Sequence, residues 1–208
     1  MTTAYKFLDK GLKSNYDGSS WTVGEWRHEK KPTEACVGLN ASRFIPDALR
    51  YVQGTILAKV EYKGAVIDSG DKVTCESMRI IKTWPWGKRE SVGLAIFAAE
   101  SVLHVFERKY PDDKRPRQTI EAARAWLEGT GTADAAYAAA RAAYAADAAN
   151  AANAAYAAAY AADAANAAAR AANAAAYATD VSDYAGTKAQ IHRLVLQMIE
   201  EAQNETNS

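Results

Sequence analysis

Hydrophobic residues in the first part of the chain follow the period of two that is typical of β-strands. Residues 55–62 alternate in this way, and residues 73–82 continue the same kind of pattern. Residues 21–26 are aromatic and β-branched, which also favours a strand. These three segments predict a sheet. The positions that share one face of the first segment are Ile56, Ala58, Val60 and Tyr62.

A short helix interrupts these strands, and an aromatic turn ends them. Ser42 is a candidate N-cap for the helix, and Pro46 falls in its first turn, where proline is tolerated. Its apolar positions are Phe44, Ile45, Ala48, Leu49 and Val52. The run Trp84-Pro85-Trp86-Gly87 breaks the strand pattern and predicts a domain boundary.

Three later segments carry the 3.6-residue period of amphipathic helices. The first covers residues 91–109, and Tyr110-Pro111 ends it. In the second, Asp112 or Asp113 caps the helix and Gly129 ends it. The third runs over residues 188–203. The predicted buried positions are Val92, Ala95, Ile96, Ala99, Val102, Leu103 and Phe106, then Ile120, Ala123, Trp126 and Leu127, then Ile191, Leu194, Val195, Met198 and Ile199.

Residues 134–180 are dominated by alanine, with 31 alanines among 47 residues. Alanine has the highest helix propensity, so this tract is predicted to be helical. A larger residue follows every third or fourth position, and this spacing rotates the larger residues around a straight helix. Two interpretations stay open: a break or hairpin near residues 150–153, or one long helix. The fold class predicted for the chain is α+β, with a small strand-rich domain over residues 1–86 and an alanine-rich antiparallel helical domain over residues 87–208.

Charge and cysteine content narrow the functional classes. The chain has 25 basic and 25 acidic residues, which argues against a protein that coats nucleic acid. No window is apolar enough for a membrane span. The N-terminus lacks the pattern of a secretory signal, so we expect a cytoplasmic protein, in the bacterial host if a phage encodes it. Cys36 and Cys75 are therefore expected to be reduced thiols in the core rather than a disulfide.

No catalytic or metal-binding motif stands in the sequence, so no cofactor and no metal are expected. The candidate sites are for ligand binding. Trp84, Trp86, Lys88 and Arg89 form an aromatic and basic cluster that either stacks a base and holds a phosphate or packs between domains. In the alanine tract, large residues on a small-residue background either line a ligand groove or form a solvated face with buried rings. The candidates there are Arg141, Arg170, Tyr144, Tyr156 and Tyr177.

One segment carries a family signature. It contains Phe106-Glu107, then Pro111-Asp112-Asp113-Lys114-Arg115-Pro116-Arg117, then Ile120-Glu121-Ala122-Ala123-Arg124-Ala125-Trp126. Followed by an alanine-rich stretch, this pattern resembles the immunity proteins of bacterial toxin–immunity systems, which have relatives in phages; the resemblance covers residues 88–187. Cys36-Val37-Gly38-Leu39-Asn40-Ala41-Ser42 is similar to a turn in an uncharacterised domain of phage and bacterial proteins.

The residues of this signature also have a physical interpretation. Asp112, Asp113, Arg115 and Arg117 suit a tight corner between two helices, where the arginines reach carboxylates or carbonyl groups by bidentate hydrogen bonds. The alternative is that Arg115, Arg117 and Arg124 bind an anion.

The resemblance implies a non-enzymatic protein that binds and neutralises a protein toxin or a host defence factor. The alternative is a sponge that sequesters a nucleotide-like small molecule through arginine, tyrosine and asparagine side chains. An enzyme acting on a nucleotide is a third class, which no motif supports. Either binding function is compatible with a homo-oligomer.

Overall fold

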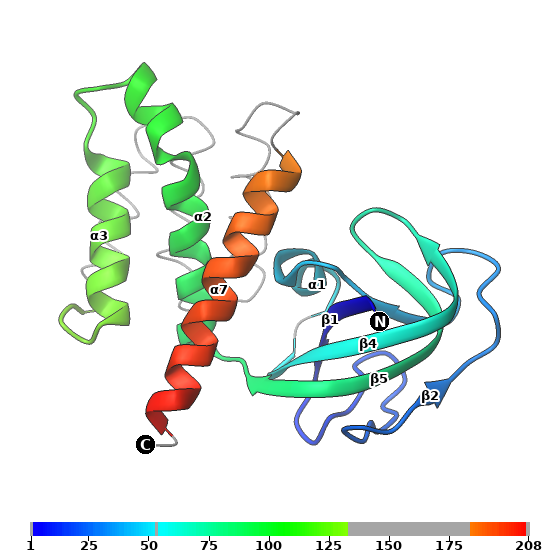
Figure 1. The fold of residues 1–208 in the computed structure, drawn as a ribbon. Helices are drawn as coiled ribbons and strands as arrows, with labels where there is room; N and C mark the ends of the chain where they lie inside the picture. Colours follow the sequence, from blue (N-terminus) through cyan, green and yellow to red (C-terminus); the bar gives the residue numbers. More distant parts are fainter. Residues whose placement is uncertain (1, 53, 133–183, 207–208) are drawn as a thin grey trace. The chain divides into compact units, whose positions relative to one another are not determined.

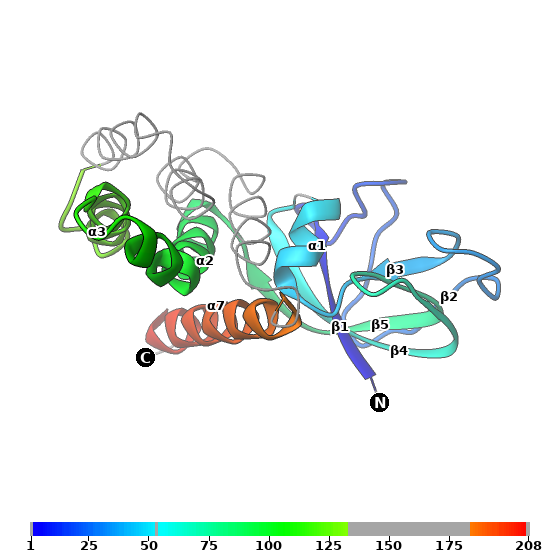
Figure 2. The ribbon, with the colours of Figure 1, turned by 90° about the horizontal axis from the view of Figure 1, so that it is seen from above.

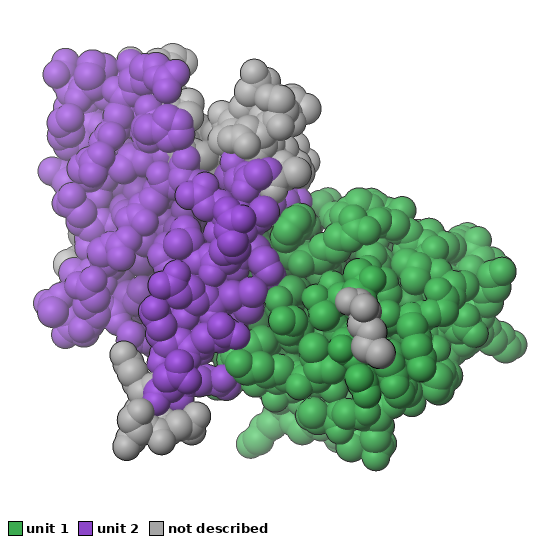
Figure 3. Space-filling model, viewed as in Figure 1, with its two compact units in different colours: residues 1–86 green, residues 87–208 purple. Residues whose placement is uncertain are grey.

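The computed structural model describes residues 2–52, 54–132 and 184–206. The chain forms two compact units, Met1–Trp86 (unit 1) and Gly87–Ser208 (unit 2), which Figure 3 shows in different colours. The alanine tract, with its predicted break or hairpin, lies outside the described residues. No helix of the described part is both long and apolar enough to cross a membrane.

Unit 1 is built on an antiparallel sheet whose strands follow the order β1-β4-β5-β2, with β3 also paired to β5 (Figure 1). The two longest strands, β4 and β5, form its centre, and their register shifts twice, as at β-bulges, which bend a sheet. The strands are β1 (Thr2–Leu8), β2 (Arg27–His28), β3 (Leu39–Ala41), β4 (Ile56–Asp68) and β5 (Val73–Pro85).

The sheet closes on itself beside β3. Ser42, the residue after β3, exchanges two backbone hydrogen bonds with Tyr5 of β1, at 2.7 and 2.8 Å. The prediction that Ser42 caps the short helix is therefore wrong, because its backbone is paired with β1. Helix α1 (Ile45–Tyr51) begins after Phe44, has no side-chain cap, and carries its proline at the start, as predicted.

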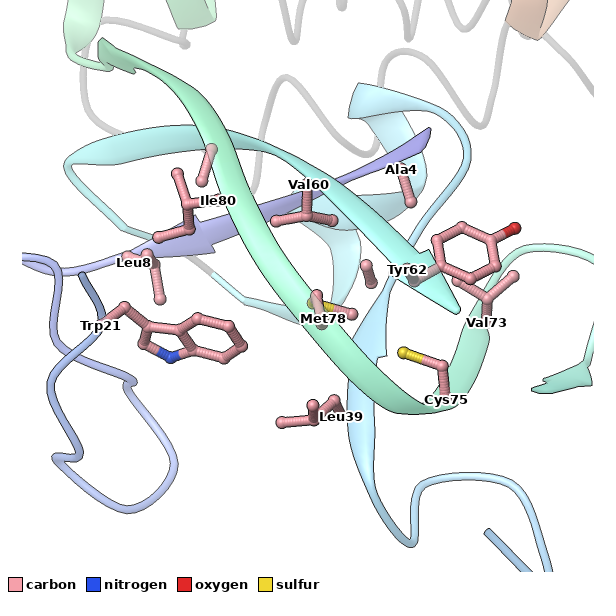
Figure 4. Close-up of a cluster of buried hydrophobic side chains, with 12 residues drawn as sticks. Ala4, Leu8, Trp21, Leu39, Val60, Tyr62, Val73, Cys75, Met78 and Ile80 are labelled. Atoms are coloured by element: carbon pink, nitrogen blue, oxygen red, sulfur yellow. The ribbon is translucent and has the colours of Figure 1, made fainter. Parts of the chain in front are cut away.

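The core of unit 1 lies inside this closed sheet (Figure 4). Side chains alternate along a strand, so Ala4 and Leu8 of β1 point to the same inner face. Trp21 comes from the loop between β1 and β2 and is 6% exposed. The other members of the cluster are Leu39, Ala41, Ala58, Val60, Tyr62, Val73, Cys75, Met78 and Ile80.

Two of the three predicted strands are confirmed, and one is wrong. The alternating segments 55–62 and 73–82 are parts of β4 and β5, which run further than predicted. Residues 21–26 form no strand; Val23 makes only an isolated bridge to Ile80. The aromatic content of this segment reflects the insertion of the Trp21 ring into the core from a loop.

Both cysteines are free thiols, as predicted. Cys75 is fully buried in the core, and burial raises the pKa of its thiol to about 11. Cys36 is exposed, which contradicts the prediction of a core position. Its backbone has a positive φ of 75° in the turn before β3, and its N–H donates a hydrogen bond to Thr74 near the start of β5.

Unit 2 contains three described helices, and α2 packs against both of the others (Figures 1 and 2). They are α2 (Lys88–Lys109), α3 (Arg115–Leu127) and α7 (Tyr184–Thr206). All three predicted helices are confirmed. The predicted cap of α3 is wrong, because Lys114 is its N-cap residue and no side chain of Asp112 or Asp113 caps it. Gly93 permits a close approach of α2 to α7, because a Cβ at this position would lie 2.3 Å from the Met198 sulfur. Predicted positions that are buried include Val92, Ala95, Ile96, Ala99, Leu103, Phe106, Ile120, Ala123, Ile191, Val195 and Ile199, whereas Trp126, Leu127, Leu194 and Met198 are half-buried.

Candidate functional site

Two ion pairs connect α2 to α3 with the same spacing on both helices. Arg117 donates two hydrogen bonds to the Glu107 carboxylate, both at 2.7 Å. Arg124 donates to Glu100 at 2.5 Å. The two carboxylates are seven residues apart on α2, and so are the two arginines on α3, in the opposite direction. Since seven residues are close to two helical turns, both pairs lie on one side of an antiparallel helical hairpin.

A third pair holds the corner between these helices. Asp113 accepts two hydrogen bonds from the Arg115 guanidinium, at 2.8 and 2.6 Å, and one from the Arg115 backbone N–H at 3.1 Å. The hydrogen bond from Arg115 lowers the pKa of the Asp113 carboxyl, and the hydrogen bond from Arg117 lowers that of Glu107. The predicted bidentate corner is therefore confirmed.

The carboxylates change how these arginines can act. Arg115, Arg117 and Arg124 remain between 42% and 49% exposed at their side chains, so a partner can reach them. Their charges are already matched by Asp113, Glu107 and Glu100, which weakens the alternative of a dedicated anion site. Only a shallow depression of about 480 Å³ lies at the corner, lined by Asp112, Asp113, Lys114, Arg115 and Gln118.

The members of the predicted aromatic and basic cluster have different environments in the structure. Trp84 and Trp86 are 1% and 4% exposed within unit 1, where Trp86 lies edge-on to Phe7 with ring centroids 5.0 Å apart. Lys88 begins α2, and its ammonium lies 5.6 Å from the centre of the Trp126 ring. The positions of Trp84 and Trp86 give no support to a base-stacking role. Arg141, Arg170, Tyr144, Tyr156 and Tyr177 lie outside the described residues.

Unit 1 contains a cavity of about 600 Å³ that the sequence did not predict (the unit 1 cavity). Strands β1 and β3 contribute to its lining where the sheet closes, together with α1 and the loop that follows β1. Its cationic side chains are Lys6, Arg27 and Lys72. Its aromatic side chains are Tyr5, Phe7, Tyr16, Trp21 and Tyr51.

Lys6 is the unusual residue of this lining. It stands between Ala4 and Leu8 on the inner face of β1, and its ammonium lies 4.6 Å from the centre of the Trp21 ring. No carboxylate of the described residues is within ion-pairing distance of it. Burial, and then the nearby Arg27, lower its pKa from 10.5 to about 8.

Arg27 differs from Lys6 because the loop after β1 neutralises its charge. Its guanidinium lies 3.5 Å from the Asp17 carboxylate and 3.6 Å from that of Glu29, and it donates a hydrogen bond to Ser19 at 2.5 Å. Hydrogen bonds from Ser19 hold the pKa of Asp17 well below its usual range. Arg27 therefore already has anionic partners in Asp17 and Glu29, and these contacts connect it to the loop that follows β1.

Lys72 is a second cation of the cavity with no carboxylate partner among the described residues. Its ammonium lies 2.6 Å from the Cys36 sulfur and 4.6 Å from the centre of the Tyr51 ring. The Tyr51 hydroxyl donates to Asp71 at 2.6 Å. The unit 1 cavity therefore combines an aromatic wall with two ammonium groups that lack a carboxylate partner among the described residues.

The described residues contain no group of three or more histidine, cysteine, aspartate or glutamate side chains that could hold a metal ion.

The sequence contains one signal for the unit 1 cavity. The run Ala4-Tyr5-Lys6-Phe7-Leu8 places a single lysine in an otherwise apolar strand. The other lining residues come from distant segments, which no local pattern connects.

Comparison with known proteins identifies unit 2. A family model described as Imm-5 like putative immunity protein matches residues 87–206, a range that begins and ends with the helices described above. No curated protein and no solved structure matches the chain. The matched range is more than half of the 208 residues and confirms the resemblance seen in residues 106–126. The chain therefore belongs to the family of Imm-5 like putative immunity proteins.

Proposed function

We propose that this chain neutralises a protein toxin by binding to it, and that unit 2 provides the binding surface. The observation that carries the proposal is the family match over residues 87–206. An immunity function of this kind needs a stoichiometric complex and no turnover.

Within unit 2, the exposed side of the α2–α3 hairpin supports the proposal best. Arg117 and Arg124 are half-exposed, and their carboxylate partners hold them in place. Arginine is enriched among the residues that dominate binding energy in protein interfaces. A side chain that is already ordered loses less conformational entropy when a partner binds. We propose that these two arginines, held by their carboxylate partners, donate hydrogen bonds to acceptor groups on the toxin surface.

The experiment is a growth assay with the protein encoded by the gene next to that of this chain. Expressed alone in a bacterial host, the neighbouring protein is expected to stop growth. Co-expression of the full chain is expected to restore growth to the level of an empty-vector control. Growth arrest that persists, while the chain accumulates as a folded protein, would contradict the proposed function.

A further inference from the structure

The unit 1 cavity lies outside the range of the family match and is not used by the proposed function. Its lining has more cationic side chains than its carboxylates neutralise. Arg27 is matched by Asp17 and Glu29, whereas Lys6 and Lys72 have no carboxylate within ion-pairing distance among the described residues. A half-buried ammonium without an anionic partner is costly, so its presence on the inner face of β1 calls for an anion.

The size and lining of the cavity indicate what carries that anion. A volume of about 600 Å³ is in the range of small-molecule sites and far exceeds the volume of a simple inorganic ion. Apolar side chains of β1, β3 and α1 line it beside the lysines, including Phe7, Leu39, Ala48 and Val52. A ligand that fills such a space needs an apolar body in addition to its charged group.

We propose that the unit 1 cavity binds a small organic acid, a carboxylate or a phosphate ester, whose anionic group is held by Lys6 and whose apolar body lies against the surrounding wall. Lys72 adds a second positive charge to the same cavity. Trp21 keeps the Lys6 stem and ammonium in place from one side. Arg27 and its carboxylate partners order the adjacent loop.

The binding test uses the full chain labelled with ¹⁵N and three probes of similar shape: benzoate, phenyl phosphate and benzyl alcohol. At pH 7 we expect at least one of the two acids to shift the Trp21 indole N–H resonance saturably. The neutral alcohol is expected to shift it little, and the Trp126 resonance of unit 2 serves as the internal reference. Tighter binding of benzoate identifies a carboxylate ligand, and tighter binding of phenyl phosphate identifies a phosphate ester.

Variants then test the role of Lys6. Lys6→Met should weaken binding of the better acid about ten- to a hundredfold, the loss expected for one charge-assisted hydrogen bond. Lys10→Met, an exposed lysine outside the cavity, should leave the affinity unchanged. Lys72→Met provides an independent variant and should weaken binding about two- to tenfold through the loss of one nearby charge.

The affinity of the wild-type chain should also fall as pH rises above about 8, where the Lys6 ammonium loses its proton. Three results would overturn the proposal. In the first, neither acid shifts the Trp21 resonance. In the second, the alcohol binds as tightly as the acids. In the third, Lys6→Met and Lys72→Met, each with an amide spectrum of a folded protein, both retain the wild-type affinity.

Discussion

Replacing Trp84 by alanine is expected to lower the free energy of unfolding of unit 1 by about 3–5 kcal/mol. The side chain is 1% exposed and comes from β5, directly across from the fully buried Leu57 of β4. Its removal leaves a cavity beside Leu57 on the same face of the sheet. Its indole N–H has no acceptor among the described residues. Removing this unsatisfied donor offsets part of the stability that is lost with the buried ring. We therefore expect the lower part of this range.

Hydrogen exchange of the β4 and β5 amides measures this effect within unit 1, because faster exchange reports the lost stability locally. Trp84→Phe is the matched variant: it fills most of the volume without the unsatisfied N–H, so it should cost less than about 1.5 kcal/mol. Tyr16→Ala, at a side chain 98% exposed, should change stability by no more than about 0.5 kcal/mol. An equal loss in Trp84→Ala and Tyr16→Ala would contradict the packing described for β5.

Lys6→Met is expected to stabilise the protein at pH 7, unlike most core substitutions. The pKa of Lys6 is lowered from 10.5 to about 8 in the folded state, so folding carries the cost of an unfavourably placed charge. At about 1.36 kcal/mol per pKa unit this is roughly 3 kcal/mol. Since Lys6 is half-buried and partly screened by solvent, we expect a gain of about 1–3 kcal/mol.

The stability difference between wild type and Lys6→Met should decrease as the pH rises. Below about pH 8, Lys6 is charged in both the folded and the unfolded state, and the full cost is present. Between about pH 8 and 10.5 the unfolded chain binds more protons than the folded one, so wild-type stability rises with pH and the advantage of Lys6→Met shrinks. The groups that act on Lys6 are Arg27, which lowers its pKa, and Asp17 and Cys75, which raise it.

Urea unfolding of both proteins at pH 7 and pH 10.5 measures the difference. Cys75 and Tyr51 have raised pKa values of about 11 and 12, which reduce stability at high pH in both proteins. Comparing the two proteins at each pH removes most of that shared effect. A variant that is less stable than wild type at pH 7, or a difference that does not depend on pH, would show that Lys6 is a structural residue instead.

The helices of unit 2 were predictable because their apolar residues follow one period over many turns. Ile191, Val195 and Ile199 form such a stripe and are buried in α7. The corner between α2 and α3 was also predictable, since Asp113 and Arg115 are two residues apart and their pairing is local. Interactions set by nearby residues leave a signal in the sequence that needs no knowledge of the tertiary structure.

Unit 1 was less predictable because its geometry depends on residues far apart in the chain. Strand β1 is buried on both faces except at Lys6 and its first two residues, so it lacks the alternation that identifies a half-exposed strand. Ser42 has the chemistry of a helix cap, but pairing with Tyr5 determines its position. The unit 1 cavity brings Lys6 and Lys72 together only after the sheet has closed, so the sequence does not reveal it.

The direct measurement of the central claim is calorimetric titration of the full chain with the protein encoded by the gene next to its own. We expect a stoichiometric complex, and we expect the double variant Arg117→Ala/Arg124→Ala to weaken it at least tenfold, the scale of an interface hot spot. Both arginines make surface ion pairs, so the double variant should remain folded. Arg193→Ala, at an exposed arginine of α7, should bind as wild type does. Absence of binding by the wild-type chain would contradict the toxin-neutralising function, and equal losses in the double variant and Arg193→Ala would contradict the α2–α3 surface.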